Sequence, residues 1–219
     1  MKVYSYVIVR DFGFAPNPFY GLCTLATCKP NIRAGAQLGD WVVATGSKSA
    51  GRAGQLVYAM QVSEVLDFDA YWSDPRFAAK RPLLNGSLKQ LYGDNIYHRG
   101  KRGWVQADSH HSFDDGKPNP ANLVRDTKTD RVLVAHRFAY FGRAPVAVPA
   151  RLRRLPGTQE DLCCPGRNHR VAGDEMAHEL EEWLDELDRW GLQALPPAFA
   201  NARRATTSGT RRRVRGARS

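Results

Sequence analysis

Alternating apolar and polar side chains predict a β-sheet. Residues 3–10 alternate and are rich in Val, Ile and Tyr, which is typical of a strand in a sheet with both faces at least partly covered. Three further segments have strand character: residues 41–44, 55–66 and 131–141. Gly13, Pro16 and Pro18 interrupt the pattern after the first strand, so residues 11–17 are predicted to form an exposed loop.

Helical spacing is clearest near the C-terminal end. Between residues 174 and 190 the apolar residues recur every three or four positions, and acidic residues cover the opposite side. The apolar positions are Met176, Leu180, Trp183, Leu184, Leu187 and Trp190. Gly191 stands where a C-terminal cap is expected. A shorter helical turn is predicted at residues 68–72, with Asp67 or Asp69 able to cap it.

Residues 83–122 are polar, aromatic and glycine-rich, and they show little periodicity. A structureless segment of this length is unusual inside a compact domain unless it has a function.

The whole pattern predicts an α+β fold, with a mixed or barrel-like β-sheet in residues 1–150. Residues 151–200 are predicted to be a C-terminal helical extension packed on that domain. Residues 201–219 are predicted to be a disordered basic tail, because Arg, Thr, Ser and Gly bury too little apolar surface.

Composition limits the classes of function. The formal net charge is +10, and the seven arginines of residues 203–219, which hold no acidic residue, account for most of it. That tail predicts a salt-dependent attraction to nucleic acid, the alternative being a solvated terminus. No segment approaches the roughly 18 apolar residues of a membrane helix, and the N-terminus lacks the pattern of a signal peptide. We therefore expect a cytoplasmic protein without a membrane partner.

Four cysteines are too few and too unevenly placed to be the framework of a disulfide-built fold, which suits a reducing cytoplasm. The adjacent pair Cys163-Cys164, followed by His169, does not have the two-residue gap common in zinc sites. We predict no metal site and no cofactor. Cys28 is a candidate nucleophile, although a lone cysteine before Lys-Pro is more often structural.

The segment Ser109-His110-His111-Ser112 offers two imidazoles beside hydroxyls. Together with Asp94, Asn95 and Asp126, these groups can perform acid-base chemistry near neutral pH, or bind a phosphate or a base edge. In an extended segment Ser109 and His111 face one way and His110 the other, so only one imidazole need point into a pocket. The alternative is a surface loop whose histidines make local hydrogen bonds.

Two further sets are candidates for ligand binding. Asn17, Lys29 and Arg33, with Ser47 and Lys48 in the loop after the second strand, suit an anionic ligand, although no P-loop motif is present. The alternative is a hairpin-type turn with solvated lysines.

Aromatic residues supply the second set, because the face of an aromatic ring can stack on a base. Tyr97 and Trp104 are the favoured members because their neighbours are polar. For any single aromatic residue, packing in the core is the commoner role.

Several short motifs together resemble the nucleotide modification associated domain family, second type. They lie between about residues 3 and 145 and include Ala15-Pro16-Asn17-Pro18-Phe19, Cys28-Lys29-Pro30, Gly39-Asp40-Trp41, Thr45-Gly46-Ser47, Tyr92-Gly93-Asp94-Asn95-Ile96-Tyr97, Ser109-His110-His111-Ser112 and Phe138-Ala139-Tyr140-Phe141-Gly142. The resemblance implies association with phage and bacterial systems that modify nucleic-acid bases. It also favours His111 and Ser109 as the catalytic members of the 109–112 segment, with Asp94 or Asp126 as the orienting carboxylate. A weaker resemblance, through Gly39-Asp40 before a strand, is to PUA-like domains of the EVE and ASCH kind, which read RNA or modified bases.

Three hypotheses follow. The first is a module that binds a nucleotide or a modified base, linked to nucleic-acid modification or phage defence. The second is an enzyme acting on a nucleobase, sugar or phosphodiester, with His111 as general acid or base. The third is an adaptor that docks a protein partner on the acidic helix 174–190.

Overall fold

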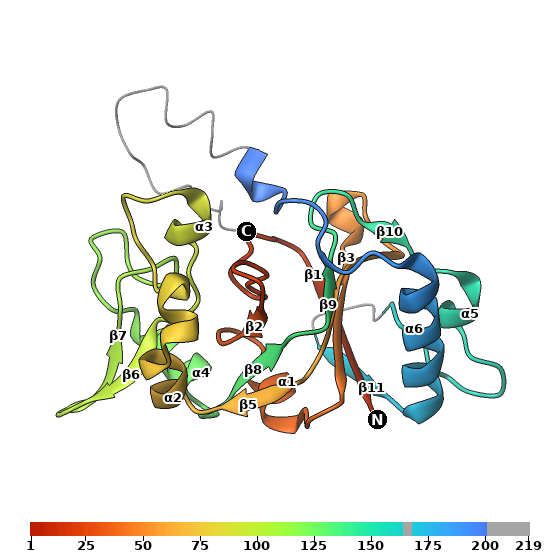
Figure 1. The fold of residues 1–219 in the computed structure, drawn as a ribbon, viewed down its shortest axis with the longest axis horizontal. Helices are drawn as coiled ribbons and strands as arrows, with labels where there is room; N and C mark the ends of the chain where they lie inside the picture. Colours follow the sequence, from red (N-terminus) through yellow and green to blue (C-terminus); the bar gives the residue numbers. More distant parts are fainter. Residues whose placement is uncertain (164–167, 201–219) are drawn as a thin grey trace.

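A computed structural model describes residues 1–163 and 168–200 and contains a central mixed β-sheet (Figure 1). The strand order is β11 (His169–Ala172), β1 (Val3–Ile8), β3 (Trp41–Gly46), β4 (Gln55–Gln61), β9 (Phe138–Tyr140) and β12 (Gly191–Leu192), with β10 (Val146–Ala147) beside β4. β1 runs parallel to β3, and β3 runs antiparallel to β4. The predicted α+β class with a mixed sheet is confirmed, and in the described part of the chain this sheet does not close into a barrel.

Two smaller sheets lie beside the central one. The first contains β2 (Cys23–Leu25), β8 (Val132–Ala135) and β5 (Glu64–Leu66), and the second is the hairpin of β6 (Tyr97–Gly100) and β7 (Gly103–Gln106). The predicted single strands 55–66 and 131–141 are therefore wrong. Each divides into two strands, β4 with β5 and β8 with β9, because the chain leaves one sheet and enters the next at residues 62–63 and 136–137.

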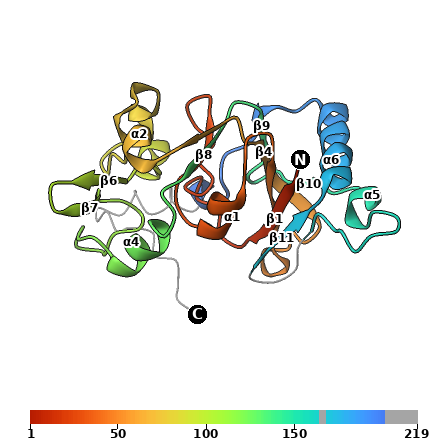
Figure 2. The ribbon, with the colours of Figure 1, turned by 90° about the horizontal axis from the view of Figure 1, so that it is seen from below.

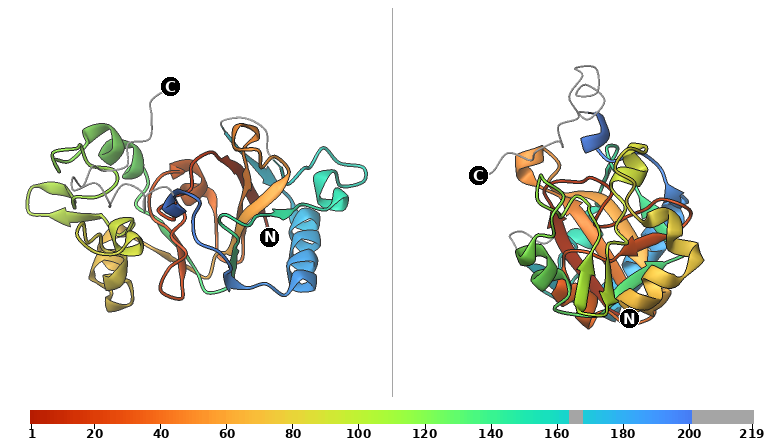
Figure 3. Two further views of the ribbon diagram at one scale, coloured as in Figure 1. Left: turned by 90° about the horizontal axis from the view of Figure 1, so that it is seen from above. Right: turned by 90° about the vertical axis from the view of Figure 1, so that its left-hand side faces the viewer.

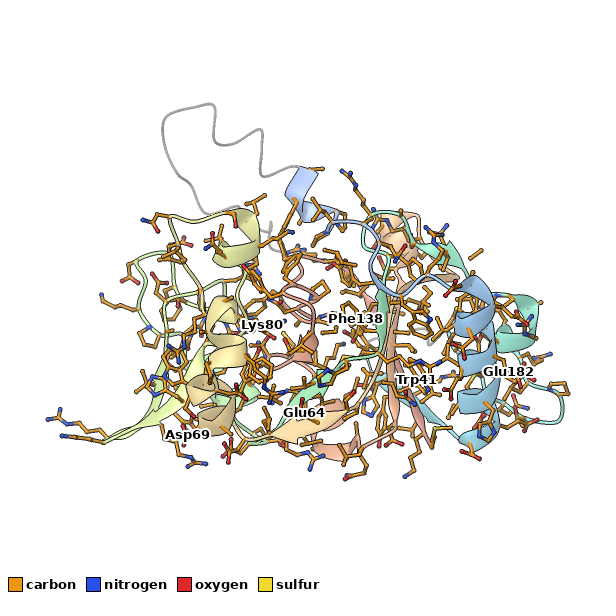
Figure 4. All side chains as sticks on the ribbon, in the orientation of Figure 1. Trp41, Glu64, Asp69, Lys80, Phe138 and Glu182 are labelled. Atoms are coloured by element: carbon orange, nitrogen blue, oxygen red, sulfur yellow. The ribbon has the colours of Figure 1, made fainter. Side chains whose placement is uncertain are left out.

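Alternating side chains of β3 serve two different cores. Trp41 and Val43 face α6 (Asp174–Leu187), whose buried residues include Leu180 and Trp183, whereas Val42 and Ala44 lie in the cluster on the opposite side. That opposite cluster also packs against α1 (Pro30–Gly35). α6 and α5 (Ala150–Arg153) thus flank one face of the sheet (Figure 2), and Trp41 lies between the sheet and α6 (Figure 4).

The C-terminal helix ends earlier than its apolar pattern predicts. α6 stops at Leu187, where Asp188 adopts a left-handed conformation with φ 46° and caps it. Gly191 does not cap the helix, because it lies in β12 beside β9. Acidic side chains of α6 pair with Arg137 and Arg151 of the same chain. Docking of a protein partner on this helix stays a prediction.

The segment predicted to lack structure is folded in part. Beside the β6–β7 hairpin lie α2 (Phe68–Ser73), α3 (Leu88–Leu91), α4 (Pro120–Asp126) and the 3-10 turn η2 (Pro75–Lys80), which form the end of the molecule opposite α6 (Figure 3). They enclose a third aromatic-rich core. Asp67 caps α2 by accepting a hydrogen bond of 2.6 Å from the amide of Ala70. Short apolar runs far apart in the sequence therefore share this core.

Residues 11–17 are mostly buried, so the prediction of an exposed loop is wrong. Gly13 has φ +63°, and a Cβ added there would lie 2.8 Å from Pro196 and 2.9 Å from Phe19. The segment can pass between these side chains because glycine has no Cβ. Cys164 and the arginine-rich tail of residues 203–219 lie outside the described residues. Within the described ranges, no helix has both the length and the apolar character to span a bilayer.

Candidate functional site

A thiol, an imidazole and a carboxylate lie in a row. His111 Nδ1 is 2.8 Å from Asp126 Oδ2, and His111 Nε2 is 3.7 Å from Cys28 Sγ. These three side chains come from three separate parts of the chain, the β2–α1 connection, the loop after β7 and the end of α4. We call Cys28, His111 and Asp126 the thiol row. A nucleophile contacting a base that a third group orients is the arrangement that nucleophilic catalysis requires.

The backbone at Cys28 has an unusual conformation. Cys28 has φ 57° and Lys29 has φ 41°, both in the left-handed region that residues with a Cβ seldom adopt. The amide of Cys28 donates to Asp126 Oδ1 at 3.0 Å, and Pro30 begins α1 directly afterwards. Strained backbone of this kind persists where surrounding contacts hold it, and it is concentrated at functional sites.

Arg33 holds this turn from inside the protein. Its guanidinium donates to the carbonyl oxygens of Cys28 at 2.9 Å, Arg131 at 2.6 Å and Thr129 at 3.3 Å, and also to that of Asp126. The side chain is fully buried. Arg33 was predicted to bind an anionic ligand, but its donors are directed to main-chain oxygens that frame the thiol row.

Asp126 is fully buried at the C-terminal end of α4. Besides its contact with His111, Oδ2 accepts a hydrogen bond of 3.0 Å from the hydroxyl of Tyr97. Tyr97 is itself fully buried, so its ring is not exposed for stacking. Burial together with the charge of Asp126 raises the pKa of the Tyr97 hydroxyl, which therefore stays a donor to the carboxylate.

Electrostatics favour a charged His111. Burial of the ring disfavours the imidazolium, but hydrogen bonds to Asp126 and Cys28 and the charges of these groups outweigh burial and raise the pKa of His111 to about 9. Burial also opposes ionisation of Asp126, yet the hydrogen bond from His111 and the nearby positive charges lower the pKa of that carboxyl. Each ring nitrogen of His111 therefore has an acceptor at neutral pH.

Residues 109–112 form a turn and not the predicted extended segment. The amide of Ser112 donates to the Ser109 carbonyl at 3.0 Å, and the amide of His111 donates to Ser109 Oγ at 3.3 Å. Ser109 thus supports the backbone of His111. The ring centres of Phe14 and His111 lie 4.6 Å apart, and those of Phe12 and His110 also lie 4.6 Å apart.

Asp94 and Asn17 belong to a second buried polar cluster around Lys80, a residue labelled in Figure 4. Lys80 Nζ donates to both oxygens of Asn17 and to the Leu22 carbonyl, each at 2.9 Å. Asp94 accepts from Thr24 at 2.7 Å and from Tyr71 at 2.8 Å. Burial raises the pKa of Asp94 to about 6 and lowers that of Lys80 to about 8. The carboxylate that orients His111 is thus Asp126, not Asp94.

The other predicted binding residues are dispersed. Asn95 donates to the carbonyls of Tyr71 and Phe77, and Trp104 packs against Phe68. Lys29 Nζ lies 4.1 Å from the centre of the Tyr6 ring. Ser47 caps the 3-10 turn η1 (Lys48–Ala50), which begins with the exposed Lys48. The structure therefore brings His111, Ser109, Asp126 and Tyr97 together, with Arg33 bonded to the main chain behind them, and the other predicted residues lie in other contacts.

Cys28 is a candidate nucleophile in the sequence, but the sequence does not connect it with His111 and Asp126. It lies 83 residues from His111 and 98 from Asp126 along the chain, so no short motif connects them. The available signal was a lone cysteine between a short strand and Pro30. Within the described ranges, no group of three or more His, Cys, Asp or Glu side chains is arranged so that it could hold a metal ion.

Comparison with known proteins gives one result. The family model described as nucleotide modification associated domain 2 matches residues 1–203. No curated protein and no solved structure matches the chain.

Proposed function

The chain belongs to the nucleotide modification associated domain 2 family, and on this premise we propose that it is an enzyme whose Cys28 thiol attacks a nucleotide or nucleobase derivative. The observation that carries the proposal is the thiol row, with Sγ at 3.7 Å from Nε2 and Nδ1 at 2.8 Å from a buried carboxylate. The family supports a role in nucleotide modification, and the row supports covalent catalysis as the chemistry.

The proposed reaction is transfer of an acyl or related group. The His111 imidazolium donates from Nε2 to the Cys28 sulfur and stabilises its thiolate form, and this sulfur bonds to an electrophilic carbon of the substrate. The leaving nitrogen or oxygen departs with the proton that His111 Nε2 gives up. Water, deprotonated by the same nitrogen, then hydrolyses the thioester and regenerates the thiolate beside the imidazolium. Asp126 stays ionised throughout, because it orients the ring and stabilises the imidazolium.

The other described cysteines do not have such surroundings. Cys23 is fully buried and Cys163 is 8% exposed, and burial raises their pKa values to about 12 and about 11. Both thiols therefore stay protonated, which suits structural roles. Among the cysteines that the structure describes, Cys28 is the one that is half-buried and contacts an imidazole.

Alkylation of the thiol tests the row directly. We expect iodoacetamide at pH 7 to modify Cys28 of the full chain, with His111→Asn at least tenfold slower, because the variant lacks the imidazolium that stabilises the reactive thiolate. Peptide mapping by mass spectrometry measures modification at each cysteine separately. His178→Asn, on the exposed side of α6, is the matched control and should react like the wild type. Equal rates for His111→Asn and the wild type contradict the proposal.

Turnover tests the substrate class. A panel of nucleotides and nucleobases carrying amide or ester groups is incubated with the wild type and with Cys28→Ala. We expect product, and a mass increase on Cys28 in stopped samples, with the wild type only. Turnover by Cys28→Ala would show that the thiol is not the nucleophile.

A binding module without turnover is the second candidate. It is favoured by the burial of His111, which is 8% exposed and has a pKa of about 9. The imidazolium then forms a buried ion pair with Asp126 that holds residues 109–112 in place. In that case His111→Gln retains affinity for nucleotides, and no member of the panel is converted by the wild type.

A further inference from the structure

A cavity of about 270 Å³ lies away from the thiol row. It opens at the carboxyl ends of the parallel strands β1 and β3, and its lining includes Ile8, Arg10, Asp11, Phe12, Arg52 and Pro197. None of the three residues of the thiol row lines it. The carboxyl ends of neighbouring parallel strands are a common position for ligand binding, because loops leave the sheet there.

Asp11 contributes an incompletely satisfied carboxylate to this cavity. Its Oδ1 accepts hydrogen bonds from the hydroxyl of Tyr140 at 2.6 Å and from the amide of Gly13 at 3.0 Å. The residue is 6% exposed, and its Oδ2 has no hydrogen-bond partner among the residues that the structure describes. A buried oxygen without a donor is costly, so it indicates a place for a ligand N–H or O–H group.

Two arginines add positive charge to the same lining. Arg10 follows β1, and Arg52 lies in the turn between β3 and β4. Among the described residues, the guanidinium of Arg52 makes no hydrogen bond. Its positive charge interacts electrostatically with Asp11. A planar guanidinium suits a phosphate, because its N–H groups donate to the phosphate oxygens.

The approach of Arg52 depends on Gly46. A Cβ at position 46 would lie 2.4 Å from Arg52 Cβ and 2.6 Å from the Arg52 carbonyl oxygen. Only glycine allows the chain to return so closely, and this return places Arg52 in the cavity wall. Phe12 and Pro197 supply apolar surface beside these charges, where a flat ring can pack.

We propose that this cavity binds a nucleoside monophosphate, with its phosphate at Arg10 and Arg52 and a donor group of its base or sugar at Asp11 Oδ2. The volume is of the order expected of a small-ligand pocket. This inference does not rest on the thiol chemistry of Cys28. Phe12 connects the two regions, because it lines the cavity and also packs against His110, the neighbour of His111.

Calorimetric titration of the full chain tests the proposal. The probes are the four common ribonucleoside 5′-monophosphates, their nucleosides and inorganic phosphate. We expect at least one monophosphate to bind tenfold more tightly than its own nucleoside and than phosphate. Arg52→Gln should weaken that monophosphate at least tenfold while affecting the nucleoside little. Asp11→Asn should weaken both, because it removes the acceptor that they share.

Arg102→Gln, in the exposed β6–β7 turn, is the matched control and should bind like the wild type. Far-ultraviolet circular dichroism and urea unfolding check that Asp11→Asn folds, and Arg52→Gln tests the site independently. If no monophosphate binds more tightly than inorganic phosphate, the cavity is an anion site only and the proposal is overturned. An affinity of Arg52→Gln for the monophosphate equal to that of the wild type also overturns it.

Alkylation of Cys28 in the same samples separates the two proposals. If a cavity variant loses nucleotide binding while its Cys28 is alkylated at the wild-type rate, the effect is assigned to the cavity. Absence of nucleotide binding in a wild-type protein whose Cys28 still reacts overturns this inference and leaves the thiol row standing.

Discussion

Replacing His111 with Asn should remove a large pH-dependent contribution to stability. The pKa of His111 is about 9 in the folded protein, against 6.5 for an unperturbed histidine. One unit of pKa corresponds to about 1.4 kcal/mol, so protonation of His111 stabilises the fold by about 3 kcal/mol. Because the folded pKa is the higher one, this stabilisation is complete below pH 6.5 and is lost as the pH rises through 9.

Urea unfolding at pH 6 and pH 10 measures this effect. We expect the difference in unfolding free energy between the wild type and His111→Asn to be about 3 kcal/mol larger at pH 6 than at pH 10. Lys80 titrates in the same range in the opposite sense, because burial lowers its pKa to about 8. Its contribution is present in both proteins and cancels in the comparison.

Proton resonances of the imidazoles provide a second measure. One ring should titrate near pH 9 in the wild type, and that titration should be missing from His111→Asn. If the stability curves of the two proteins run parallel from pH 6 to pH 10, the His111–Asp126 pair does not have the strength inferred from its geometry.

Three further predictions concern stability, each measured as an unfolding free energy. Arg33→Met should cost about 3 kcal/mol or more, because four buried or half-buried carbonyls lose their donor, whereas Arg102→Met in the exposed hairpin should cost almost nothing. Similar unfolding free energies for the two variants would contradict the framing role of Arg33. Gly46→Ala should cost about 1–3 kcal/mol, because its Cβ would overlap the Arg52 backbone, and an unchanged midpoint would mean that the turn relaxes freely. Asp188→Gly should stabilise the fold by about 1 kcal/mol, since glycine adopts the left-handed cap without strain, and a lower melting temperature would oppose this.

Local patterns predicted the parts of the fold that depend on local physics. The alternation of residues 3–10 and the helical spacing after residue 174 correspond to β1 and α6. Side chains of a strand alternate between two faces and those of a helix repeat about every 3.6 residues, so both patterns are visible in consecutive residues. The same patterns did not show where a strand changes sheets. Ser63 bonds to Val134 of another sheet, and that partner is 71 residues away.

The site divides in the same way. Residue chemistry, together with the family resemblance, indicated His111, Ser109 and Asp126 as candidates, since imidazoles, hydroxyls and carboxylates have these abilities wherever they occur. Tertiary structure decided that Asp126 and not Asp94 orients His111, that Arg33 faces carbonyls, and that Cys28 lies at the other ring nitrogen. A side chain's reactivity follows from its type, but its partners follow from long-range packing, which no local spacing records.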